Sequence, residues 1–153
     1  MPSDYCAEHT KNIRSNPKCR QIEALARKPA QEAVPAIIEY FADPNKDVRT
    51  FAMEVVGGCF RHEAESYIKK PLSSRDKNTL GTALNLVGIC AYSTYKQDVR
   101  DIAWSADDET IQFLAVLTLR DFNDEEGLRR VARSHPKVKV RAFAERVLRL
   151  PPH

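Results

Sequence analysis

Residues 33–58, AVPAIIEYFADPNKDVRTFAMEVVGG, decide the fold predicted for this chain. From Val48 onward, apolar or small residues recur at i, i+3, i+4, i+7, i+8 and i+11, the spacing of one face of an amphipathic helix. Before an Asp43-Pro44 turn, the same face is present in a shorter helix, at Val34, Ile37, Ile38 and Phe41. The segment is therefore predicted to be a hairpin of two helices.

The pattern of this hairpin recurs along the rest of the chain. The longer-helix pattern starts again at Thr79, Ile111 and Val140, which are 31, 32 and 29 residues apart from one start to the next. Shorter helices with a matching face are predicted around residues 64–71, 99–103 and 128–135. Such a period predicts an all-α fold, an α-solenoid (α-α superhelix) of about four to five helix hairpins. We expect one domain over residues 1–153, with capping helices in 1–30 and repeats at 31–60, 61–92, 94–122 and 124–150.

One segment permits a different prediction. IQFLAVLTL, residues 111–119, is short, apolar and partly β-branched, as a buried strand would be. The repeat spacing favours a helix instead. As a helix it is apolar nearly all round, with Phe113, Val116 and Leu117 off the core face. It is therefore expected either in the centre of the stack or in an interface.

The hairpin motif resembles that of the HEAT-repeat family, in its short, phycobilisome-lyase-like form. The match consists of an Asp-Pro turn, then Val-Arg, then Ala three residues on and an apolar pair: Asp43, Pro44, Val48, Arg49, Ala52, Val55 and Val56. HPKVKVRAFAERVL (135–148) resembles the second helix again, whereas the two middle repeats agree only in spacing. The resemblance implies a helical solenoid. It says little about function, because members of the family bind proteins, bind nucleic acids or catalyse reactions.

Charge is distributed unevenly along the chain. The formal net charge is +3, and 29% of the residues are charged. Residues 11–28 and 128–149 are basic, while residues 98–126 carry nine acids against Arg100 and Arg120. These stretches are either solvated helix faces with acids at helix starts, or a charge map that orients a partner or a second copy of the chain.

No residue set in the sequence requires catalysis or a cofactor. His62-Glu63 resembles the iron-binding pairs of HEAT-repeat hydroxylases, but that site needs several pairs and this chain has one. Trp104 with Asp107 and Asp108 invites comparison with alkylpurine DNA glycosylases, yet this acidic stretch would repel phosphate. We expect no enzyme activity, no metal and no cofactor.

The four cysteines, Cys6, Cys19, Cys59 and Cys90, are not spaced for zinc. Cys59 and Cys90 occupy the same position of the repeat and are predicted to be buried thiols on the core face. The polar opening residues and the lack of a long apolar run predict a cytoplasmic protein without a membrane segment. Self-association remains open.

Two binding functions are predicted, and the first is preferred. The first is a protein or peptide adaptor that docks its partner in a groove lined by Arg49, Met53, Leu84, Val116 and Arg141. The alternative for these groove positions is that they pack against the adjacent repeat. The second function is binding of nucleic acid through the basic ends, with phosphate contacts from Arg129, Arg130, Arg133, Lys137, Lys139 and Arg146.

Overall fold

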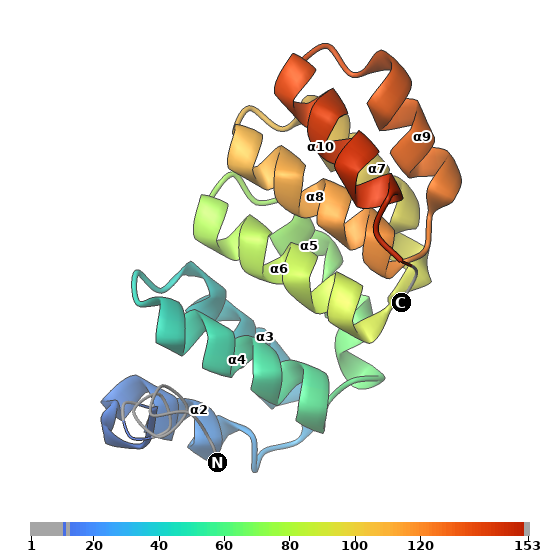
Figure 1. Cartoon of the computed structure of the whole chain (residues 1–153). Helices are drawn as coiled ribbons and strands as arrows, with labels where there is room; N and C mark the ends of the chain where they lie inside the picture. The colour runs from blue at the N-terminus through green and yellow to red at the C-terminus, as the bar shows by residue number, and fades with distance from the viewer. Residues whose placement is uncertain (1–10, 12, 152–153) are drawn as a thin grey trace. The chain divides into compact units, whose positions relative to one another are not determined.

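The structure is a computed structural model, and it describes residue 11 and residues 13–151. Every regular element in these residues is helical, which confirms the all-α prediction (Figure 1). Residues 5, 6 and 9 of the predicted first capping helix lie outside the described residues. The chain divides into two compact units, Met1–Ala83 and Leu84–His153, and each is described by itself.

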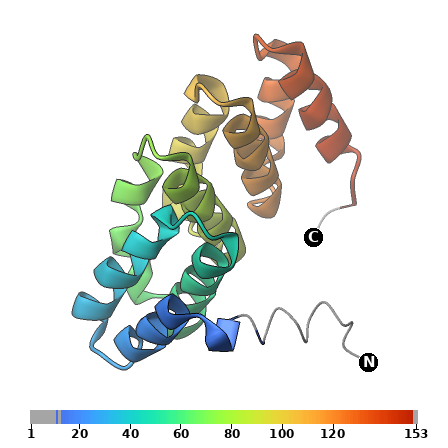
Figure 2. The same cartoon turned by 90° about the vertical axis from the view of Figure 1, so that its left-hand side faces the viewer.

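The first unit contains α2 (Pro17–Leu25), α3 (Ala30–Ile38), the 3-10 helix η1 (Glu39–Ala42) and α4 (Lys46–Cys59). Helices α3 and α4 pack on each other and both contact α2 (Figure 2). The core of this unit includes Ile22, Val34, Ile37, Phe41, Val48, Ala52 and Val56. The longer helix starts two residues before the predicted Val48, because Asn45 caps it by accepting a hydrogen bond from the Asp47 N–H at 2.9 Å.

The shorter helix predicted at 64–71 is broken into two pieces. A 3-10 helix, η2 (Glu63–Tyr67), is followed by the single turn α5 (Lys69–Leu72). Pro71 has no N–H to continue the ladder of hydrogen bonds, and the Ser73 hydroxyl donates to the Lys69 carbonyl at 2.9 Å, which ends the turn. Helix α6 (Lys77–Cys90) then begins in the first unit and ends in the second.

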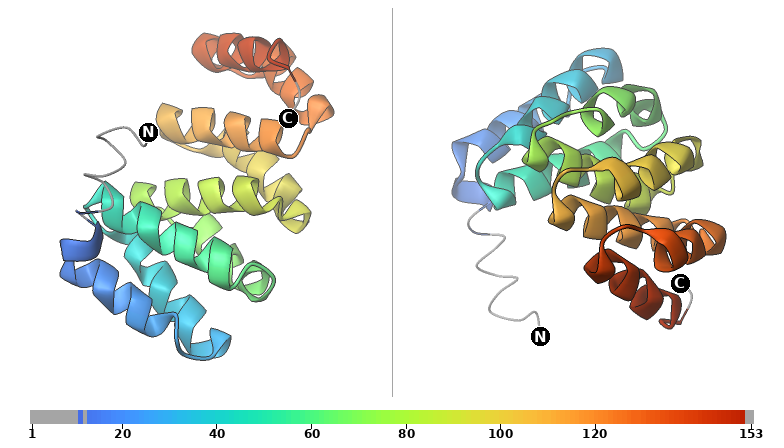
Figure 3. Two further views of the ribbon diagram at one scale, coloured as in Figure 1. Left: turned by 60° about the horizontal axis from the view of Figure 1, so that its bottom comes forward. Right: turned by 90° about the horizontal axis from the view of Figure 1, so that it is seen from above.

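The second unit is completed by η3 (Ser93–Tyr95), α7 (Lys96–Ser105), α8 (Glu109–Asp121), α9 (Glu125–Ser134) and α10 (Val138–Leu148). Helix α8 contacts α7, α9 and α10, and α9 pairs with α10 (Figure 3). Residues 111–119 are thus helical and most of them are buried, so the strand alternative was wrong. Asp108 caps α8 by accepting from the Ile111 N–H at 3.1 Å.

One cysteine lies where the repeat pattern did not predict it. Cys90 is buried, as predicted, but Cys59 is exposed. The buried face of α4 runs through Val48, Ala52 and Val56, and the next position on that face belongs to Phe60, which is 8% exposed. Phe60 therefore occupies the core position that the prediction assigned to Cys59.

The end of α6 offers a direct test of backbone strain. Ala91 has a φ of 52°, in the left-handed region that favours glycine, and the Tyr92 N–H reaches back to the Val87 carbonyl at 3.1 Å. We expect Ala91→Gly to raise the free energy of unfolding by about 0.5–1 kcal/mol, because it relieves the contact of the Ala91 Cβ with the backbone. Urea denaturation measures the change.

The matched control is Ala142→Gly on the exposed side of α10. There the same substitution falls inside a helix and should lower the free energy of unfolding by about 1 kcal/mol. Equal destabilisation by both variants would contradict the strain assigned to Ala91.

Candidate partner-binding surface

Two of the five residues of the predicted groove are not available to a partner. Leu84 and Val116 are completely buried, with 0% exposure, so neither side chain is presented to a partner. For these two positions the structure shows packing in the core, which was the alternative. Met53 is partly exposed on α4.

Arg49 and Arg141 have a structural role that explains their repetition. The Arg49 guanidinium donates to the Asp43 carbonyl at 2.7 Å and to the Pro44 carbonyl at 3.1 Å. Arg141 donates to the carbonyl of His135, also six residues before it, at 2.5 Å. Each arginine thus holds the turn that precedes its own helix through one nitrogen of its guanidinium.

Asp43 adds a carboxylate to the first of these turns. It accepts hydrogen bonds from Lys18 at 2.6 Å and from the Asn45 N–H at 2.9 Å. Burial by itself would raise the pKa of Asp43, but these hydrogen bonds and the charges of Lys18 and Arg49 lower the pKa overall. The Asp-Pro turn is therefore a fixed connection between α2 and α4.

The cations predicted to contact phosphate are distributed over α9 and α10. Arg129 lies 3.5 Å from Glu125, and the Arg130 guanidinium sits 5.6 Å from the centre of the Trp104 ring. Arg133, Lys139 and Arg146 are exposed, whereas Lys137 is partly exposed. Within residues 13–151, no carboxylate lies within ion-pairing distance of these last four. They remain candidates for contact with an anionic partner.

Partly exposed apolar side chains gather where α8 and α10 meet. The rings of Phe113 on α8 and Phe143 on α10 pack edge to face with their centres 4.9 Å apart, and both keep some exposure. Leu117 follows Phe113 by one turn and is 38% exposed. Sequence reasoning expected Phe113 and Leu117 off the core face, but it placed Phe143 inside the core.

Two cations border this apolar cluster. Lys139 and Arg146 stand four residues before and three residues after Phe143, and therefore on the same side of α10. Both are exposed. We call Phe113, Leu117, Lys139, Phe143 and Arg146 the α8–α10 surface. One feature of the sequence indicates this surface. Helix α8 has no charged residue from Thr110 to Leu119, although one side of it is exposed to solvent.

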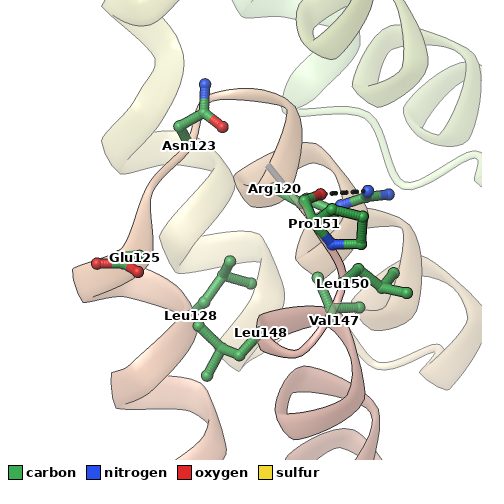
Figure 4. A pocket seen from close by; sticks show the side chains of 8 residues that line it. All are labelled: Arg120, Asn123, Glu125, Leu128, Val147, Leu148, Leu150 and Pro151. Atoms are coloured by element: carbon green, nitrogen blue, oxygen red, sulfur yellow. Dashed lines mark hydrogen bonds between the residues drawn. The ribbon is translucent and has the colours of Figure 1, made fainter. Parts of the chain in front are cut away.

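A pocket of about 330 Å³ lies at the ends of α8 and α10. Its apolar wall includes Leu128, Val147 and Leu148, and the Arg120 guanidinium lies at its edge, where it donates to the Pro151 carbonyl at 3.1 Å (Figure 4). Leu150, next to Pro151, is 47% exposed. The pocket combines apolar side chains with the cation of Arg120 and the carboxylate of Glu125.

A buried ion pair holds the helices behind these features. Arg100 on α7 donates two hydrogen bonds to the Asp124 carboxylate, each 2.6 Å long. The same carboxylate accepts from the Gly127 N–H at 3.2 Å and so caps α9. Burial by itself would raise the pKa of Asp124, but the hydrogen bonds from Arg100 and Gly127 and the charges of Arg100 and Lys96 lower it overall.

Trp104 and His135 belong to this structural centre. Their ring centres are 5.1 Å apart, and the His135 Nε2 lies 2.9 Å from the Ala103 carbonyl. His135 is completely buried just beyond the end of α9, which corrects its predicted place on the helix face. Arg130, which lies over the Trp104 ring, is one of the residues that line the pocket of about 250 Å³ beside Trp104. Trp104 therefore packs against its neighbours at the end of α7.

The His62-Glu63 pair and a pocket of the first unit do not indicate a particular ligand. His62 and Glu63 are exposed, and among the described residues no three His, Cys, Asp or Glu side chains lie close enough together to hold a metal ion. The first unit has a pocket of about 720 Å³ between the α3–η1 and η2–α5 segments. Its edge mixes Glu39 with Lys69 and Lys70, so it favours neither sign of charge.

Comparison with known proteins identifies no relative of this chain. No protein family, no curated protein and no solved structure was found to match this chain. Among the described residues, each helix is too short or too polar to cross a lipid bilayer.

Proposed function

We propose that this chain is a non-catalytic cytoplasmic adaptor, a solenoid of four to five HEAT-like hairpins that docks a protein partner. The observation that carries the proposal is the α8–α10 surface. Aromatic side chains are enriched in the centre of protein interfaces, and the rim around that centre is polar.

The rest of the second unit supports this choice of surface. Helix α8 is held from behind by α7 and α9, and the buried pair of Arg100 and Asp124 links α7 to the start of α9. A rigid support of this kind lowers the entropy cost of binding, because the anchoring side chains are already ordered. The proposal replaces the groove predicted from sequence, whose central residues Leu84 and Val116 are buried.

A peptide display experiment tests the proposal. Random peptides displayed on phage would be selected on the immobilised full chain, and the selected peptides would be measured against Leu117→Asp. We expect the substitution to weaken their binding at least about tenfold, because it puts a charge into the apolar centre of the interface.

The matched control is Cys59→Asp, which adds the same charge at an exposed position of the first unit. It should leave the affinity unchanged, and circular dichroism should show that both variants keep their helices. Selection that yields no peptide sensitive to Leu117→Asp would overturn the proposed function.

Nucleic-acid binding is the second candidate. It is favoured by Arg133, Lys137, Lys139 and Arg146, which have no carboxylate partner among residues 13–151. It is disfavoured by the first turn of α9, where Glu125 and Glu126 accompany the arginines. The apolar side chains of the α8–α10 surface also have no use in phosphate binding, so the protein partner is preferred.

A further inference from the structure

We infer that the partner of the α8–α10 surface is an acidic amphipathic helix, which lays its apolar side chains on Phe113, Leu117 and Phe143 and its carboxylates against Lys139 and Arg146. The inference rests on the proposed function and specifies the chemistry of the partner.

The shape of the surface favours a helix as the bound element. Phe113 and Leu117 lie one turn apart along α8, and Phe143 packs against Phe113 from the neighbouring helix. A partner helix that lies along this seam would bring side chains at i, i+4 and i+7 onto it, over about two turns.

The charges of the surface favour acidic residues on that helix. From Val138 to Arg149, α10 and its end carry Lys139, Arg141, Arg146 and Arg149 against the single acid Glu145. Glu145 stands two residues after Phe143 and so points to the other side of the helix. Arg141 stands two residues before Phe143, about 200° from it around α10, and donates to the His135 carbonyl, which leaves Lys139 and Arg146 as the cations beside the aromatic pair.

Within residues 13–151 neither of these two cations has a carboxylate neighbour at ion-pairing distance. A partner carboxylate would therefore meet a cation that needs no release from an existing pair. Such contacts at the edge of an apolar interface contribute mainly to specificity and to the rate of association.

A second display library tests the inference. Its members are Ala-based amphipathic helices with variable apolar residues at i, i+4 and i+7, and with Glu, Gln or Lys encoded equally at the flanking positions. We expect the wild-type chain to enrich Glu over Lys at those positions. The double variant Lys139→Glu with Arg146→Glu should enrich Lys instead.

Affinity measurements on one enriched Glu peptide and its Glu→Lys counterpart complete the test. The double variant should bind the Glu peptide at least about tenfold more weakly than the wild type, and it should regain affinity for the Lys peptide. Circular dichroism should show that Leu117→Asp and the double variant keep the helical signal of the wild type.

Three outcomes would overturn the inference. The first two are enrichment without preference for Glu and the absence of any binder from the helical library. Either one excludes an acidic helix as the partner. The proposed function still holds in both cases if peptides of the first library remain sensitive to Leu117→Asp. The third outcome is binding of a DNA duplex that falls steeply with salt. If that binding is lost in the charge-reversed variant but is unaffected by Leu117→Asp, the surface is assigned to nucleic acid instead.

Discussion

Asp124→Ala is expected to lower the free energy of unfolding by about 3–5 kcal/mol, the range for breaking a buried ion pair by removal of one partner. The Asp124 side chain is 3% exposed, and it receives two hydrogen bonds from Arg100 and one from the Gly127 N–H. The substitution leaves the Arg100 cation, itself only 24% exposed, without its main partner, and it removes the cap of α9. Urea denaturation at neutral pH measures the loss.

Two further variants separate the charge from the cap. Asp124→Asn keeps an oxygen that can accept from the Gly127 N–H but removes the negative charge, so it should lose less than Asp124→Ala. Asp107→Ala removes an exposed acid of the loop between α7 and α8, and it should change the free energy of unfolding by no more than about 0.5 kcal/mol. A loss of less than about 1 kcal/mol for Asp124→Ala would show that the pair is dispensable.

The pH dependence of this loss has a definite sign. Because the pKa of Asp124 is lowered in the folded protein, its stabilising contribution is present above the ordinary carboxyl pKa of about 4. The contribution is lost as the pH falls through the lowered pKa of the folded state. The difference in stability between the wild type and Asp124→Asn should therefore be largest near neutral pH and should narrow in acid.

His135→Ala should lower the free energy of unfolding by about 3 kcal/mol, through two effects in one place. It leaves the Ala103 carbonyl without the His135 Nε2, 2.9 Å away, and the Lys137 N–H without the Nδ1, 3.1 Å away. It also opens a cavity where a completely buried ring packs against Trp104. The loss would be measured by urea denaturation, followed by the fluorescence of Trp104, the single tryptophan of the chain.

The control for His135 is the exposed His62. His62→Ala should leave the free energy of unfolding within about 0.5 kcal/mol of the wild type. If the two histidine variants are equally stable, the contacts of His135 with α7 and with the turn between α9 and α10 contribute nothing to the free energy of unfolding.

The period of the apolar residues predicted most of the helices because it depends on local geometry alone. A face repeated every 3.6 residues can be recognised without knowledge of what covers it, and α4, α6, α8 and α10 begin two residues before the predicted positions Val48, Thr79, Ile111 and Val140. The prediction was less accurate at the η2–α5 segment, where Pro71 interrupts the helix.

The candidate site could be predicted only in part. The uncharged run from Thr110 to Leu119 indicated that α8 is central or lies in an interface, and the structure places most of it in the core with Leu117 at the surface. The repeat template placed Val116 and Leu117 alike off the core face. Val116 is buried and Leu117 is not, because α8 packs against α7, α9 and α10, and its buried side is wider than the template. The exposure of Phe143 depends on how α10 is rotated against α8, which is a property of the packed pair.

The sequence by itself thus determined that the chain is helical and where its longer helices lie, since these follow from short-range periodicity. Only the tertiary structure decided the roles of the polar residues. Arg49 and Arg141 resembled groove residues but hold turns, and Asp124 pairs with Arg100 from a different helix, 24 residues away. Polar roles depend on which atoms meet across helices, and that arrangement is set by the packing of the core rather than by the spacing of residues along the chain.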